Sequence, residues 1–247
     1  MFQKLFRLVI RRAKRLLPDS FLRKYRLGRK LARHTFRHLI DSKKRRKYTE
    51  LIFSKFPDLK VGRQAGLVLD LGANLGHFSD ACKEIGYSVV CVEPHPDAID
   101  YLERRFRHLS EIEIVKKAIT RRGTPTQLQF HPDHDNDPLT TSLSASIISE
   151  KFEAVHKSVT VPGVTLENFF ACNERYEIVK IDIEGAEIFL IEDLIRFAPR
   201  IKRLLLETHS RYMNNSKDGE DYILKLALLD NFIVKNKLEG AWFTDWV

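Results

Sequence analysis

The chain has 247 residues, and its 42 Lys and Arg against 33 Asp and Glu give a formal net charge of +9. No apolar run reaches the ~18–20 residues that span a bilayer, and basic residues interrupt the N-terminus too often for a signal peptide. Three cysteines, odd in number and widely spaced, argue against a disulfide framework or a zinc knuckle. We therefore expect a protein of a reducing, cytoplasmic compartment.

The charge is divided unevenly along the chain. Residues 1–48 hold 18 Lys and Arg against two acidic residues, net +16, whereas residues 49–247 hold 24 against 31, net −7. Over residues 2–17 apolar residues recur at helical spacing between the basic ones, until Pro18 ends the pattern. This predicts a basic amphipathic N-terminal arm, residues 1–47, joined to a body, residues 48–247, of single-domain size. A short helix beginning at Tyr48 is expected to cap the body.

After Gly66, short apolar runs alternate with amphipathic stretches. The runs predict strands over 67–71, 88–93, 111–115, 178–183 and 201–207, and the stretches predict helices over 78–85, 97–106, 166–171, 186–197 and about 217–229. Two further strands, 127–130 and 158–161, flank a polar loop over 131–146, and 232–235 with 242–244 could form a closing antiparallel pair. The alternation predicts an α/β fold, a Rossmann-like doubly wound sheet with helices on both faces.

A glycine-rich turn follows the first strand. Asp70, Gly72, Asn74 and Gly76 alternate there, and Glu93 ends the next strand 23 residues after Asp70. Glycine permits a tight turn and a close ligand, asparagine tolerates positive φ, and an acid at this distance can accept hydrogen bonds from ribose hydroxyls. A carboxylate before the loop repels phosphate and attracts an amino group, which favours S-adenosylmethionine over NAD. The alternative is an ordinary glycine turn.

Two further groups of residues are expected at the carboxyl edge of the sheet, where such folds bind ligands. Asp182, Glu184 and Glu187 follow one strand, and His209 follows the next. An acidic first turn of a helix accounts for Glu187 but not for Asp182, so Asp182 or Glu184 is predicted to touch cofactor or substrate. A neutral histidine is a competent general base, although His209 could also be a solvated loop residue.

One segment has a composition that could bind metal, but its context argues against it. Residues 131–137 contain two histidines and three aspartates. They lie in a polar loop with no flanking element to fix ligand geometry, so a solvated acidic loop is the better interpretation. No metal-binding residue is predicted.

Taken together, these motifs resemble FkbM-type S-adenosylmethionine-dependent methyltransferases over about residues 66–210. Besides the glycine loop and the acidic cluster, the resemblance rests on Glu93-Pro94, Ala118, 141–145, 164–166 and 206–209. It implies a seven-stranded, mostly parallel class I methyltransferase sheet, with Asp70, Gly72, Asn74, Gly76 and Glu93 binding the cofactor and Ala118 near the adenine. Glu167 departs from the family's usual aspartate, at a position expected to cap a helix.

The function expected from these features is S-adenosylmethionine-dependent O-methylation of a sugar, glycan, glycolipid or other small natural product. Asp182 or His209 would take the acceptor's proton while Glu184 holds the acceptor. Two alternatives stay open: an RNA methyltransferase whose arm binds phosphates, and a non-catalytic interaction protein with this fold. The apolar stripe of the arm favours an anionic membrane surface over nucleic acid, although the arm could be a solvated tail or pack on the body.

Overall fold

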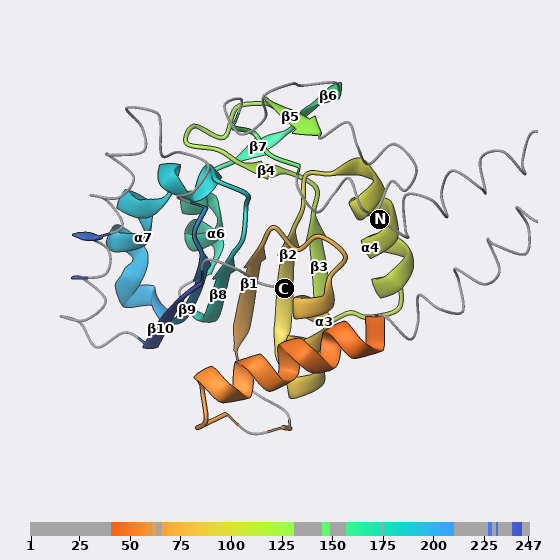
Figure 1. Cartoon of the computed structure of the whole chain (residues 1–247), viewed down its shortest axis with the longest axis vertical. Coiled ribbons are helices and arrows are strands. Elements are labelled where there is room, and N and C mark those ends of the chain that lie inside the picture. Colours follow the sequence, from red (N-terminus) through yellow and green to blue (C-terminus); the bar gives the residue numbers. More distant parts are fainter. Residues whose placement is uncertain are drawn as a thin grey trace, which may run out of the picture. The chain divides into compact units, whose positions relative to one another are not determined.

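Six parallel strands form the central sheet of the computed structural model (Figure 1). The structure describes residues 41–59, 61–62, 66–130, 145–148, 157–173, 175–209, 227–228, 231 and 239–243. The chain consists of two compact units, Met1–Arg46 and Lys47–Val247, and the sheet belongs to the second. In their order across the sheet, the strands are β10 (Glu239–Phe243), β9 (Ile201–Glu207), β8 (Tyr176–Ile181), β1 (Leu67–Leu71), β2 (Ser88–Val92) and β3 (Ile112–Val115).

Each face of the sheet has its own hydrophobic core, because successive strand residues point to opposite sides. The helices are one over 41–55, α3 (His77–Ile85), α4 (Pro96–Phe106), α6 (Leu166–Cys172) and α7 (Ile191–Phe197), with 3₁₀ turns η4 (Ala186–Phe189) and η5 (Ala198–Arg200). Leu69 and Leu71 of β1 lie in the core formed with α6 and α7, whereas Val68 lies in the core formed with α3, α4 and residues 48–59. Helices on both faces of a parallel sheet confirm the predicted α/β class.

Two small sheets lie beyond the carboxyl end of β3 in the chain (Figure 1). β4 (Ala118–Ile119) pairs in parallel with β7 (Gly163–Val164), and β5 (Thr126–Phe130) pairs antiparallel with β6 (Lys157–Val161). The β5–β6 pair corresponds to the two strands predicted around the polar loop. The loop itself, including residues 131–137, lies outside the described residues except for 145 and 146.

Helix α6 begins at Leu166, as predicted, but its cap is not the expected Glu167. Thr165 is its N-cap: the Thr165 hydroxyl accepts a hydrogen bond from the Asn168 N–H, and the Asn168 side chain accepts one from the Thr165 N–H. Glu167 lies in the first turn of the helix. The expectation that Glu167 caps the helix was therefore wrong, and the cap is supplied by the threonine two residues before it.

The helix predicted over 186–197 is two elements. Backbone φ is +57° at Glu184 and +102° at Gly185, so the chain leaves β8 through a left-handed turn. A 3₁₀ turn, η4, follows, and α7 starts only at Ile191. The interruption follows from Glu187. Its carboxylate is completely buried and accepts a hydrogen bond from the Gly185 N–H at 2.8 Å. A first helical turn that faces solvent would not allow this burial.

The structure describes several other predicted segments only in part. The described residues form six strands in the main sheet. Of the predicted closing pair, residues 239–243 form β10, which runs parallel to β9. Residues 232–235, the other predicted strand of that pair, lie outside the described residues. Of the helix predicted over 217–229, residues 227 and 228 are helical. The helix over 41–55 is continuous across the predicted boundary after residue 47 and starts earlier than Tyr48, whereas residues 1–40 lie outside the described part. Within that part, no helix is both long and apolar enough to span a bilayer.

Candidate active site

The glycine turn between β1 and α3 is held tightly against neighbouring elements. At Gly72, φ is +76°, and a Cβ atom would lie 1.7 Å from the backbone oxygen of Asp182. At Gly76, the N-cap of α3, φ is +72° and a Cβ atom would lie 2.5 Å from the Phe106 ring of α4. Close packing of protein against protein therefore requires both glycines. Asn74 has a φ of +50°, as an asparagine in this turn can.

Glu93 follows β2 and is 5% exposed. Its Oε2 accepts a hydrogen bond from the Asn74 N–H (2.7 Å) and its Oε1 accepts one from the His95 N–H (2.8 Å). Burial raises the pKa of Glu93 to about 7, although the two backbone donors act to lower it. Each carboxylate oxygen has a further lone pair, so the group can still accept hydrogen bonds from a ligand.

Asp70 lies in β1, just before the glycine turn, and is fully buried. Its Oδ2 accepts a hydrogen bond from the Ser79 hydroxyl at 2.6 Å, and its Oδ1 lies 3.3 Å from the Lys180 ammonium. The predicted role of Asp70 was to attract a cationic amino group. In the structure a cation of the protein, Lys180, is already beside it.

Lys180 connects three parts of the site. Its Nζ donates a hydrogen bond to the Gly72 carbonyl at 2.8 Å and lies 3.4 Å from Asp182 Oδ2. Burial acts to lower the pKa of Lys180, but the charges of Asp70 and Asp182 raise it by more. Lys180 was not among the predicted site residues. Its signal in the sequence is a charged side chain between Val179 and Ile181 in a mostly apolar strand.

A cavity that is open to solvent lies at the carboxyl edge of the sheet. Six of the nine predicted site residues line it: Gly72, Asn74, Glu93, Ala118, Asp182 and Glu184. Apolar side chains, among them Ile119, Leu128 and Ile147, complete the wall. Asp70, Gly76 and His209 are not among its lining residues.

His209 is brought to the same region by β9 and is 3% exposed. Its Nδ1 lies 3.0 Å from Glu187 Oε1, which also accepts a hydrogen bond from the His209 N–H at 2.9 Å. Its Nε2 lies 3.5 Å from Glu184 Oε2 and 3.8 Å from Glu207 Oε1. Burial acts to lower the pKa of His209, but the hydrogen bond and charge of Glu187, with the charges of Glu184 and Asp182, raise it above its ordinary value.

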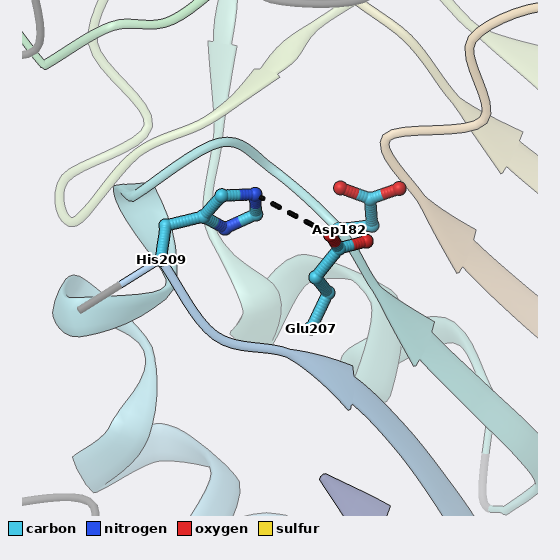
Figure 2. A group of neighbouring side chains, drawn as sticks. All are labelled: Asp182, Glu207 and His209. Carbon is cyan, nitrogen blue, oxygen red and sulfur yellow. Dashed lines mark ion pairs between the residues drawn. The ribbon is translucent and has the colours of Figure 1, made fainter. Parts of the chain in front are cut away.

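Asp182 and His209, which belong to separate motifs in the sequence, lie close together in the structure (Figure 2). Asp182, Glu184 and His209 lie together, and Glu187, interpreted as a helix-terminal acid, is the buried group that fixes the backbone and the ring of His209. Tyr48, in the helix over 41–55, was also missed. Burial raises the pKa of Tyr48 to about 12, and its hydroxyl interacts electrostatically with Lys180 and Asp182.

The chain matches one family model and is weakly similar to a solved structure. Residues 70–230 match the family model of the methyltransferase FkbM domain. A search of curated proteins gave no match. Among solved structures, the chain is similar to a candidate RNA methyltransferase from Pyrococcus horikoshii, with 14% identity and a TM-score of 0.31, over 63% of this chain and 54% of that one. The matched part thus spans about half the length of that protein.

Proposed function

This chain belongs to the FkbM methyltransferase family, as its motifs predicted, and on that premise we propose that it transfers the methyl group of S-adenosylmethionine to a hydroxyl oxygen of a sugar, glycan, glycolipid or other small natural product. The observation that carries the proposal is the cavity lined by Glu93 after one strand and by Asp182 and Glu184 after another. Among its described lining residues, three acids face one base, Lys117. This balance favours a ligand with positive charge and no phosphate.

The lining residues fit the parts of such a cofactor. Glu93 offers carboxylate lone pairs to ribose hydroxyls, since each of its oxygens uses only one lone pair to accept from a backbone N–H. Ala118, Ile119 and Leu128 supply an apolar wall for an adenine ring. Asp182 and Glu184 lie where a cationic group and the acceptor would meet. Asp70 acts indirectly, by holding Lys180 beneath the glycine turn.

When bound, S-adenosylmethionine supplies an electrophilic methyl carbon on a sulfonium. The protein has to align the acceptor oxygen with the S–CH₃ bond and remove its proton, so that the O–C bond forms as the C–S bond breaks and its electron pair returns to sulfur. Asp182 or His209 takes the proton and Glu184 holds the acceptor. The structure favours Asp182 for direct contact, because it lines the cavity whereas His209 reaches it through Glu184.

Isotope transfer tests the proposal. Purified protein and labelled S-adenosylmethionine are incubated with cell extract, and the label is followed into lipid, glycan, protein and RNA fractions. We expect label in the lipid or glycan fraction. Asp182→Asn should reduce transfer by about 10²–10⁴-fold while calorimetry still detects cofactor binding. Asp100→Asn on the exposed face of α4 is the matched control. Full turnover by both Asp182→Asn and His209→Ala would refute the catalytic assignment.

The fractions also separate the alternative functions. The net charge of +16 over residues 1–48 is the observation that favours nucleic acid. Label in RNA, with steeply salt-dependent binding, would support the RNA methyltransferase. Cofactor binding without label in any fraction would support a non-catalytic interaction protein.

We also propose that residues 1–47 hold the enzyme at an anionic membrane surface, where a lipid-linked or glycan acceptor could be presented. The support is the sequence alone: cationic side chains alternate with an apolar stripe that phosphate binding does not use. In liposome flotation, the full chain should float with anionic vesicles and a chain lacking residues 1–47 should not. Equal flotation of the two would refute the membrane role.

A further inference from the structure

Three potential metal ligands lie together where β8 and β9 end. They are Asp182, just beyond β8, Glu207, the last residue of β9, and His209. One ligand atom from each lies within 4.8 Å of the others (Figure 2). Parallel neighbouring strands bring their carboxyl ends to the same edge, so the sheet itself sets this geometry. Glu207 and His209 are buried, and Asp182 is partly exposed.

A second observation concerns the orientation of the imidazole. Glu187, completely buried and outside the group of three, lies 3.0 Å from His209 Nδ1. A carboxylate only accepts hydrogen bonds, so Nδ1 carries a proton, and Nε2 is the nitrogen that turns toward Glu207. Histidines that bind metals have this arrangement: the second ring nitrogen donates to a carboxylate, which fixes the tautomer and the ring.

The charges around His209 also favour binding of a cation. Around His209 the structure gathers the carboxylates of Asp182, Glu184, Glu187 and Glu207. The nearby cation, Lys180, lies closest to the Gly72 carbonyl at 2.8 Å and to Asp70 at 3.3 Å, and 3.4 Å from Asp182. Buried carboxylates are costly unless they are paired or coordinate a cation. Among the described residues around His209, carboxylates therefore outnumber cationic side chains, which suits a cation-binding site.

We propose that the side chains of Asp182 and Glu207 and the Nε2 atom of His209 bind a divalent cation. Ligand atoms on opposite sides of a cation with bonds of ~2.0–2.6 Å lie about 4–5.2 Å apart, so the observed spread of 4.8 Å accommodates one. Mixed oxygen and imidazole ligands suit Mn²⁺ or a similar first-row ion. The cation takes the place of a proton on Nε2. No metal ligand was predicted from the sequence.

The role of the cation rests on the proposed function. Asp182 lines both the cavity and the cation site, so an acceptor hydroxyl in the cavity can occupy an open coordination position. Coordination lowers the affinity of that oxygen for its proton. A bound cation changes the roles given above: Asp182 and His209 become its ligands and no longer take the proton. The proton passes instead to Glu184, the remaining carboxylate of that end of the cavity. The oxygen gains the methyl group, and sulfur keeps the electron pair of the C–S bond.

Binding of Mn²⁺ to the full chain tests the site without any methyl transfer. The electron paramagnetic resonance signal of free Mn²⁺ is followed during titration, and we expect one bound ion per chain. Glu207→Gln and His209→Ala should each weaken binding by at least about tenfold, and Glu187→Gln by about 10- to 100-fold. Glu113→Gln, the same charge change on the exposed face of β3 at the other end of the sheet, should bind as wild type does.

Two results would overturn the proposal. One is a folded wild-type chain that binds no Mn²⁺ at millimolar concentration. The other is a loss of binding in Glu113→Gln equal to the loss in Glu207→Gln, which would indicate general electrostatic attraction. If a buried variant fails to fold, Asp182→Asn replaces it, because that side chain is 23% exposed. Ion binding without methyl transfer would support the cation site and refute the proposed function. Methyl transfer that resists a chelator, with no ion bound, would refute the cation site and leave the proposed function in place.

Discussion

Replacing Glu93 with glutamine should weaken S-adenosylmethionine binding and remove its pH dependence. Burial raises the pKa of Glu93 to about 7, so the carboxylate is mostly ionised at pH 8 and mostly protonated at pH 6. Only the ionised form offers both oxygens as acceptors while two backbone N–H groups donate to it. If only that form binds the cofactor, the apparent Kd of the wild-type protein is about tenfold higher at pH 6 than at pH 8.

Glutamine loses more than the charge. Its amide NH₂ would face one of the backbone donors, either Asn74 or His95, so one hydrogen bond is lost even before the ligand arrives. Hydrogen bonds to a charged group contribute about 1.5–3 kcal/mol, and each 1.4 kcal/mol is tenfold in affinity. We therefore expect Glu93→Gln to raise the Kd at pH 8 by about 10- to 150-fold, with a nearly constant Kd from pH 6 to pH 8.

Isothermal titration calorimetry at pH 6, 7 and 8 measures both effects, with Asp100→Asn as the control that should keep the wild-type pH dependence. Thermal unfolding of the free protein adds a second readout. Because the folded-state pKa of Glu93 lies above its ordinary value, its contribution to stability is lost as pH rises from about 4.5 through 7, and Glu93→Gln removes that part of the decline. A wild-type Kd that is the same at pH 6 and pH 8 would refute the reasoning, as would a variant that keeps the wild-type pH dependence.

Two further substitutions test the framework of the site. Gly76→Ala should cost about 1–3 kcal/mol of unfolding free energy in urea, because its Cβ would lie 2.5 Å from α4 at a φ of +72°. Gly62→Ala, with a φ of +148° and nothing within 4 Å, should cost less, and equal losses would show that the clash is unimportant. Lys180→Met should cost about 3–5 kcal/mol, because it leaves Asp70 and Asp182 without their cation; a variant with wild-type stability would contradict the role given to Lys180.

The local parts of the site could be read from the sequence. The turn after β1 is built from glycines and an asparagine with positive φ, as its composition predicted, and Glu93 follows the next strand as its spacing predicted. Such features depend on backbone sterics within a few residues and on the regular length of a strand–helix–strand unit. Asp182 and Glu184 were placed at the edge of the sheet for the same reason, since parallel strands end there.

The break between η4 and α7 shows where local reasoning failed. Residues 186–197 have a helical pattern of apolar residues, and periodicity alone predicts one helix. The structure instead turns Glu187 inward, where it accepts hydrogen bonds from Gly185 and from His209, 22 residues later. A pattern of single residues does not encode that partner, so neither the break nor the burial of Glu187 could be predicted.

The sequence by itself determined the elements, their alternation and the faces on which strand residues lie, because these follow from sterics and from the periods of strand and helix. The tertiary structure decided which strands became neighbours. β8 lies beside β1 although about a hundred residues separate them, and this adjacency places Lys180 between Asp70 and Asp182. β9 lies beside β8 and brings His209 to Glu187. Hydrophobic patterning fixes what is buried but not against what, so the charges that meet at the site were settled only by the order of the sheet.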